Sequence, residues 1–206
     1  MNCAVRNCVY AFTVGFFVLT QSVASLGKDG REGKSIDVVT PSSSNSATSS
    51  NSASPSEFQW NEHRKLSWDD FRGAVNAASE ESAAATHCGI GFRTAANSTD
   101  GKPEIIVYNT FYVNKSWVKP DAKISTILDH EQGHFDLCEI YTRKLKARMN
   151  NFDFNTGDLK QQLLSIYTEV SNEYETRQQA YEQETVHGTN TAQQKKWQNM
   201  IIRELL

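Results

Sequence analysis

Apolar residues recur every three or four positions through much of the second half of the chain. This spacing runs over about 121–149, about 158–185 and about 190–206, and it predicts three amphipathic helices. Pro120 and Asp121 are typical of a helix start and place the beginning of the first helix there. The positions that define the helices are Ile124, Ile127, Leu128, Phe135, Cys138, Tyr141, Leu145 and Met149, then Leu159, Leu163, Ile166, Val170, Tyr174 and Tyr181, then Trp197, Ile201 and Leu205.

Two shorter segments before the helices have the composition of strands. Residues 86–94 and 103–113 are rich in β-branched and aromatic side chains, and the turn-forming sequence NSTDGK at 97–102 separates them. Their spacing predicts an antiparallel hairpin. Together with the helices, it predicts an α+β domain in which a small antiparallel sheet is followed by three helices.

Residues 25–57 contain almost no side chains that could form a core. Their second half, PSSSNSATSSNSASPS at 41–56, is a Ser-rich tract that buries too little apolar surface to offset the entropy lost on ordering it. We therefore expect a disordered linker over 25–57 and a single folded domain over 58–206.

Residues 1–24 have the three parts of an export signal. Arg6 supplies a positive charge, residues 9–19 are almost continuously apolar, and Ser22 and Ala24 are small residues at the positions that a signal peptidase reads. The apolar stretch is shorter than the roughly 20 residues that a membrane-spanning helix needs. We expect a signal peptide over 1–24 that is cleaved on export, no membrane span afterwards, and a secreted or periplasmic protein.

Composition narrows the class of function. The chain has 206 residues, 38% of them hydrophobic, and a formal net charge of -3. A protein that binds nucleic acid mainly through its charge is basic, so we expect no nucleic-acid partner. The apolar fraction is below the roughly 45–50% of an average globular domain, which agrees with a linker outside the core.

The sequence HEQGH at 130–134 lies within the first predicted helix. His130 and His134 are one turn apart and project from the same side, so both imidazoles can bind one metal ion. Glu131 lies beside them, where it can accept a proton from a metal-bound water. Polar side chains on an otherwise apolar helix face are costly to bury unless they are paired or bind a metal. We expect a Zn²⁺ site with Glu131 as the catalytic base.

A catalytic zinc ion needs a third protein ligand and an open position. His187, just after the second predicted helix, is the preferred third ligand, and Glu184 within that helix is the alternative. His87, in a strand before the first helix, is expected to line the cleft. Three carboxylates of the first helix are available to orient a ligating histidine: Asp129, Asp136 and Glu139.

Two further features leave alternatives open. Cleavage of the signal peptide leaves Cys88 and Cys138, which can form a disulfide in an oxidising compartment or stay as two buried thiols. Tyr112 and Tyr181 could each donate a hydrogen bond to a developing oxyanion, or pack as ordinary half-buried rings.

Four motifs occur in the same order as in one bacterial family. They are W-x(5)-L-x-W-x-D-F-x-G at 60–73, NTFYVNKSWVK at 109–119, DHEQGHFDLCEIYTRKL at 129–145, and YEQETVHG at 181–188 with a tryptophan beyond it. Together they resemble the predicted secreted Zn-dependent proteases of bacteria, over nearly all of 58–206. The resemblance implies a zincin-like metallopeptidase that is exported to the periplasm or the cell surface.

The resemblance also bears on individual residues. It implies that His130 and His134 are ligands, that Glu131 is the base, and that His187 is a functional residue. One position differs, since Glu182 follows Tyr181 where the family pattern leads us to expect aspartate. The carboxylate is kept, with one more methylene of reach.

The sequence thus predicts a secreted zinc peptidase that hydrolyses a peptide or protein substrate with metal-activated water. The strand predicted over 103–113 is expected to offer an edge to which an extended substrate adds by backbone pairing. Two alternatives use the same residues: a non-catalytic zinc-stabilised module of the cell envelope, and a hydrolase of peptidoglycan amide bonds. Glu131 favours an enzyme because a structural zinc site has no use for a base.

Overall fold

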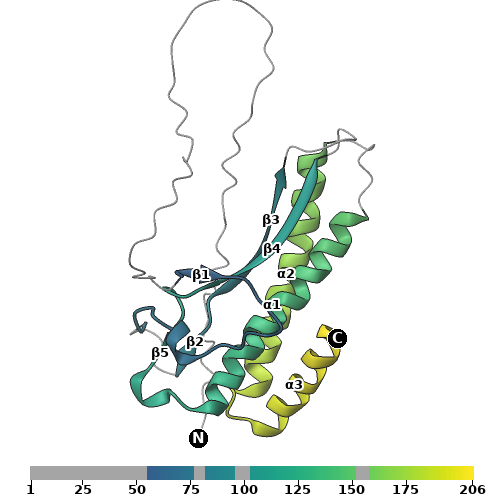
Figure 1. Cartoon of the computed structure of the whole chain (residues 1–206). Coiled ribbons are helices and arrows are strands. Elements are labelled where there is room, and N and C mark those ends of the chain that lie inside the picture. The colour runs from purple at the N-terminus through teal and green to yellow at the C-terminus, as the bar shows by residue number, and fades with distance from the viewer. Residues whose placement is uncertain (1–54, 77–81, 96–102, 152–157) are drawn as a thin grey trace, which may run out of the picture. The chain divides into compact units, whose positions relative to one another are not determined.

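The computed structural model describes residues 55–76, 82–95, 103–151 and 158–206 (Figure 1). The predicted signal peptide, residues 25–54 of the predicted linker and the turn at 97–102 lie outside the described residues. Within the described part of the chain, no helix is long and apolar enough to cross a membrane.

The larger sheet has three antiparallel strands in the order β1-β4-β3, with β1 at Glu57–Phe58, β3 at Cys88–Ala95 and β4 at Glu104–Tyr112. In the β3–β4 hairpin, Cys88 lies opposite Phe111 and Ala95 lies opposite Glu104. The hairpin that the sequence predicts is therefore confirmed. Glu57, which we expected to be the last residue of the linker, is instead the first residue of β1.

A second, two-stranded sheet joins β2 (Ala84–Ala85) to β5 (Trp117–Val118). The sequence analysis did not predict this pair, because strands of two residues leave no periodic pattern. The pair is held to α1 by Thr86, whose hydroxyl donates to the backbone carbonyl of Glu131 at 3.3 Å. It therefore brings residues 82–85 to the part of α1 that carries HEQGH.

Three helices complete the domain: α1 (Ser125–Asn150), α2 (Leu159–Thr185) and α3 (Thr191–Leu205). The three predicted helices are confirmed, although α1 begins later than expected. Pro120 and Asp121 lie in a separate 3-10 turn, η2 (Pro120–Ala122). A side-chain N-cap starts α2, where the Asp158 carboxylate accepts hydrogen bonds from two backbone N–H groups of the first turn.

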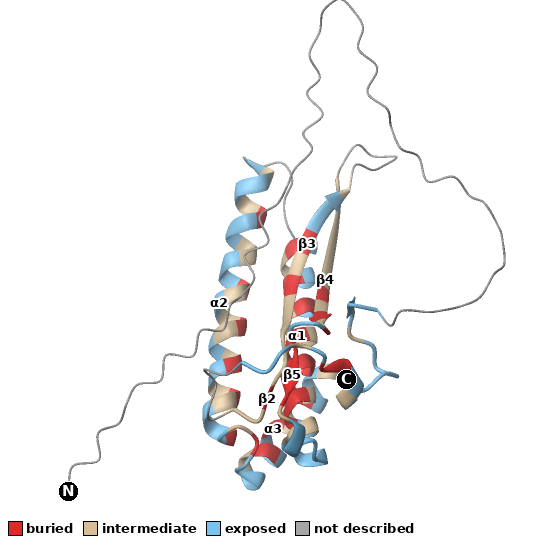
Figure 2. Cartoon of the chain, turned by 90° about the vertical axis from the view of Figure 1, so that its left-hand side faces the viewer, coloured by how far each residue is buried: buried red, intermediate tan, exposed pale blue. Residues whose placement is uncertain are grey.

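Helix α1 is the central element, since it contacts β3 and β4 as well as α2 and α3 (Figure 1). Helix α2 turns its buried residues toward α1 and exposes its outer face (Figure 2). Between α1 and the sheet, the rings of Phe111 and Phe135 are almost fully buried and lie 5.3 Å apart. Burial of each such ring contributes about 2 kcal/mol, so this contact fixes α1 on the sheet.

The segment after β1 is anchored to α1 by polar contacts. The Trp60 indole donates to the Asp136 carboxylate at 2.7 Å, and the backbone N–H of Leu66 donates to the Gln132 amide oxygen at 2.8 Å. The Gln132 amide nitrogen donates in turn to Asp136 at 2.7 Å. Asp136 thus holds the aromatic-rich N-terminal segment on α1. The side chains that donate hydrogen bonds to it are Trp60 and Gln132, so it does not orient an imidazole.

Candidate metal centre

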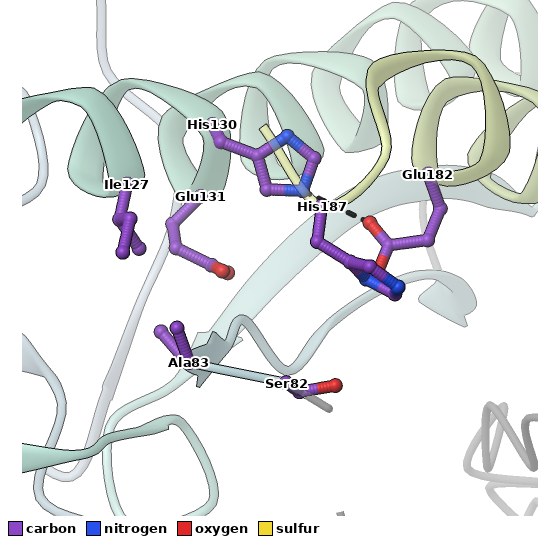
Figure 3. Close-up of a pocket in the computed structure, with 8 residues that line it drawn as sticks. Ser82, Ala83, Ile127, His130, Glu131, Glu182 and His187 are labelled. Carbon is purple, nitrogen blue, oxygen red and sulfur yellow. Dashed lines mark hydrogen bonds and ion pairs between the residues drawn. The ribbon is translucent and has the colours of Figure 1, made fainter. Parts of the chain in front are cut away.

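Two helices bring three ligand atoms together. His130 and His134 lie one turn apart on α1, and their Nε2 atoms are 3.1 Å from each other. Glu182, in the last turn of α2, places its Oε2 atom 2.9 Å from the first of these nitrogens and 3.1 Å from the second. Figure 3 shows the His130 ring directed at this carboxylate. Two imidazole nitrogens and one carboxylate oxygen, all within 4.8 Å of one another, form a set that can hold a metal ion.

The hydrogen bonds of His130 leave its Nε2 atom facing Glu182. The Tyr181 hydroxyl donates to the His130 backbone carbonyl at 3.0 Å, and it accepts from the Gln194 amide nitrogen at 2.8 Å. The oxygen of that amide therefore faces His130 Nδ1, at 3.1 Å, and accepts its proton. With the proton on Nδ1, the Nε2 lone pair points at the place where the three ligand atoms meet.

His134 is oriented by a second glutamine in the same way. The Gln178 amide nitrogen donates to the His134 backbone carbonyl at 2.9 Å, a group that can only accept. The amide oxygen is thereby directed at His134 Nδ1, at 2.6 Å. Both histidines thus donate from Nδ1 to a buried amide and direct Nε2 toward the same point, as metal-ligating histidines do.

The electrostatics of the site are dominated by Glu182. Burial alone would raise the pKa of its carboxyl group, but hydrogen bonds with His130, His134 and His187 outweigh burial and hold that pKa well below its usual range. Burial would lower the pKa of His134, whereas the hydrogen bond and the charge of Glu182 raise it to about 9. Without a metal, an imidazolium at His134 therefore neutralises Glu182. A bound cation would take over that role.

His187 reaches the site because α2 ends in a left-handed turn. Three consecutive residues, Val186, His187 and Gly188, have positive φ angles of 51°, 55° and 79°. This turn brings His187 Nδ1 to 2.5 Å from Oε1 of Glu182, the carboxylate oxygen that the other two histidines do not contact. A Cβ atom on Gly188 would lie 2.8 Å from the His130 Cβ, so glycine is needed for the turn to pack against α1.

Glu131 lies beside the three ligand atoms, on the open side of the site. Its side chain is buried, and its Oε2 atom has no hydrogen-bond partner among the described residues. The cavity next to it, about 10 Å³, has room for one particle the size of water. His130, Glu182 and His187 line this cavity, and residues 82–84 close its far side (Figure 3).

Gly133, the glycine of HEQGH, is needed for α1 to pack against Tyr181. A Cβ atom on Gly133 would lie 2.2 Å from the Tyr181 hydroxyl oxygen, a separation that no real structure tolerates. The Tyr181 ring stacks on His130 at a centroid distance of 4.8 Å and also contacts Trp197 at 5.3 Å. Because its hydroxyl donates to a backbone carbonyl, Tyr181 supports His130 from behind and has no proton left for an oxyanion.

The other predicted site residues lie elsewhere. Glu184 accepts a hydrogen bond from the Trp197 indole at 2.8 Å and so joins α2 to α3. Glu139 accepts from Asn109 at 2.6 Å and pairs with Arg143 at 2.8 Å, so it does not orient an imidazole. Asp129 is exposed, and neither His87 nor Tyr112 is among the residues that line the cavity.

Sequence reasoning noted the Glu182 carboxylate without assigning it to the metal, and it missed the two glutamines. Gln178 and Glu182 follow Tyr174 at four-residue steps, so the three residues share one face of α2. This face also carries the apolar Tyr181. A run of polar residues on a face that must be buried against HEQGH is the signal that could have identified them.

One comparison with known proteins covers the elements that carry the candidate ligands. A family model described as "Bacterial protein of unknown function (DUF922)" matches residues 109–188. No curated protein and no solved structure matches the chain. The matched range runs from β4 to the end of the left-handed turn and contains His130, Glu131, His134, Glu182 and His187. Over the part of the chain that forms the candidate metal centre, this protein is similar to a bacterial family of unknown function.

Proposed function

We propose that this protein is an exported, zincin-like peptidase that binds one Zn²⁺ ion and hydrolyses peptide bonds. His130, His134 and Glu182 would hold the ion, since their ligand atoms converge and both imidazoles are oriented by buried amides. Glu182 replaces His187 as the third ligand in this proposal, because His187 contacts the other oxygen of the same carboxylate. Export rests on the predicted signal peptide.

The observation that carries the proposal is the unpartnered oxygen of Glu131. A buried carboxylate oxygen without a partner is costly, and such atoms are retained where a ligand or substrate completes them. Here the atom borders the cavity that His130 and Glu182 also line. A site that only stabilised the fold would need no such oxygen beside its ligands.

The chemistry follows from what each side chain can do. A zinc ion held by His130, His134 and Glu182 would lower the pKa of a water molecule and polarise a carbonyl group. Glu131 accepts the proton that the attacking water loses and then donates it to the leaving amine. His187 holds Glu182 in place through Oε1 and lies on the open side of the site, where its side chain is 28% exposed.

The substrate would approach along residues 82–84. The sequence analysis expected the strand at 103–113 to offer an edge to the substrate. Strand β4 pairs with β3 along one edge and with β1 only at Phe111 and Tyr112 on the other, and none of its residues lines the cavity. Residues 82–84 border the cavity instead, and they carry small side chains. Strand β2 pairs with β5 along one edge, and none of the described strands pairs with its other edge. We assign this other edge to substrate pairing.

Replacing Glu131 by glutamine tests the function. We expect Glu131→Gln to retain zinc, because Glu131 is not among the three ligands, and to lose at least about 100-fold of its hydrolytic activity, because glutamine cannot accept the proton. Zinc is measured by elemental analysis, and hydrolysis is measured on a peptide library and on cross-linked peptidoglycan peptides. Glu184→Gln, two residues beyond the ligand Glu182, is the matched control and should keep both properties. Full activity in a zinc-loaded Glu131→Gln variant would refute the mechanism.

The third ligand is tested by metal retention alone. Glu182→Gln should lose zinc, since it removes the carboxylate that both imidazoles face. His187→Ala should retain most of it. The opposite result, loss in His187→Ala and retention in Glu182→Gln, would restore His187 as the ligand.

A further inference from the structure

We propose that Cys88 and Cys138 are joined by a disulfide bond that links strand β3 to helix α1. This inference is independent of the metal and of the peptidase activity, because neither cysteine lines the cavity or belongs to the three candidate ligands.

The two thiols meet between the sheet and the helices. Cys88 is the first residue of β3, and its Sγ atom lies 3.7 Å from the backbone oxygen of His134. Cys138 follows His134 by one helical turn, so its side chain starts from the same place on α1. The Cys88 Sγ atom also lies 3.4 Å from the Tyr174 hydroxyl oxygen. Contact with Cys138 lowers the pKa of the Cys88 thiol, and burial together with contact with Cys88 raises the pKa of the Cys138 thiol.

The surroundings favour a covalent bond over two thiols. Cys138 is fully buried, and both sulfurs are thiols in the structure. A thiol is a weak hydrogen-bond donor, so the pair gains little from its mutual contact. The two residues are far apart in the chain, and cross-links that close long loops restrict the unfolded chain most. A covalent bond between the two sulfurs would add that restriction.

The reaction is a thiol–disulfide exchange with a disulfide oxidant. One thiolate attacks a sulfur of the oxidant and releases one thiol, which leaves a mixed disulfide on the protein. The second cysteine then attacks that mixed disulfide and releases the second thiol. The two cysteines lose two electrons and two protons in total, and the oxidant gains them as two thiols. Because Cys138 is buried, the bond forms while the chain folds.

Peptide mapping tests the bond directly. The full chain with Cys3→Ser and Cys8→Ser retains only the two cysteines in question. After refolding with reduced and oxidised glutathione, the free thiols are alkylated and the protein is digested with trypsin without reductant. We expect peptide 73–93 linked to peptide 124–143 in mass spectrometry, and recovery of the two separate peptides after reduction. Recovery of both peptides alkylated from a cooperatively folded protein would overturn the proposal, and so would either peptide linked to a second copy of itself.

Thermal unfolding gives a second readout. Reduction of the refolded protein should lower Tm by about 10 °C, since a cross-link that closes a loop of this length restricts the unfolded chain. The matched control adds Cys88→Ala and Cys138→Ala to the same background, and its Tm should not respond to the reductant. An equal Tm before and after reduction would show that the two sulfurs stay as thiols.

Discussion

A glutamine amide has one fixed orientation when its two ends face chemically different partners. Gln178 meets this condition, because its nitrogen faces a backbone carbonyl and its oxygen faces the His134 ring. Gln178 therefore determines which nitrogen of the His134 ring carries the proton, although it is not one of the three candidate ligands. This orientation supports our proposal that the two histidines are ligands rather than a buried hydrogen-bonded pair.

Removing that orienting oxygen should weaken the metal site. We expect Gln178→Met, which keeps the length of the side chain, to lower the affinity for zinc by about 10- to 100-fold. The affinity is measured by competition with a chromophoric chelator. Gln179→Met, at the neighbouring exposed position, is the control and should bind zinc as the wild type does. Equal affinity in the two variants would show that the amide does not orient the ring.

Zinc binding should release a proton from His134. In the metal-free protein the pKa of this imidazole is raised to about 9, so the ring is protonated at neutral pH, and the proton must leave before Nε2 can bind a metal. The affinity for zinc should therefore fall as the pH falls, by about tenfold per pH unit in the range below the raised pKa. Calorimetry in buffers of different ionisation enthalpy measures the released proton. Binding without proton release at pH 7 would contradict this account.

At the scale of the helices, one glycine sets the distance between α1 and α2. Gly133 lets the Tyr181 hydroxyl approach the α1 backbone, and Tyr181 in turn supports the His130 ring. The sequence alone could not reveal this role, because the contact joins residues of two helices. The short side chain inside HEQGH is thus part of the helix packing as much as of the motif.

Gly133→Ala measures this packing. Alanine has the better helix propensity by about 1 kcal/mol, yet we expect the free energy of unfolding to fall by about 2 kcal/mol because the new methyl group overlaps Tyr181. Urea unfolding gives the value. Gly89→Ala is the control, since a Cβ atom there meets nothing within 4 Å, and its stability should change by less than about 0.5 kcal/mol. A stabilised Gly133→Ala variant would show that Tyr181 moves aside freely.

The helices and strands in which apolar side chains recur at a regular spacing could be predicted from the sequence. The hairpin and all three helices follow from side-chain periodicity, and the end of α2 at Thr185 matches its prediction. The start of α1 was placed too early, because a proline and an aspartate mark a 3-10 turn as readily as a helix. Strands β2 and β5 are too short to have a period, although Ala84 of β2 lines the cavity next to Glu131.

Only those residues of the candidate metal site that lie on α1 could be derived from the sequence. His130, Glu131 and His134 belong to one turn of one helix, so their spacing is enough to group them. Glu182 comes from another helix, and its distance from His134 depends on how α1 and α2 pack. The sequence analysis weighed His187 against Glu184 as the third ligand and did not consider Glu182. The left-handed turn that directs His187 at Glu182 has no signature that periodicity reveals.

At the scale of the whole domain, a metal ion would couple α1 to α2. Its ligands come from both helices, so binding stabilises their packed arrangement and the unfolded chain gains nothing comparable. With zinc at about 100 times its dissociation constant, we expect an additional stability of about 2.7 kcal/mol, which raises Tm by about 8 °C over the chelator-treated protein. Differential scanning calorimetry measures the shift. The Glu182→Gln variant should show no shift, and a zinc-independent Tm in the wild type would argue against a metal at this position.

The order of the site residues along the chain has a consequence for biosynthesis. Most of α1 and α2 lies between the HEQGH turn and Glu182 in the sequence. Gln194, which orients His130, comes later still. A growing polypeptide that ends before Gln194 lacks the residue that orients His130. The zinc ion that we propose would therefore find its complete set of ligands and orienting residues only after translation has passed α2 and entered α3. The supply of metal ions in the compartment where the finished chain folds would then decide which ion the site receives.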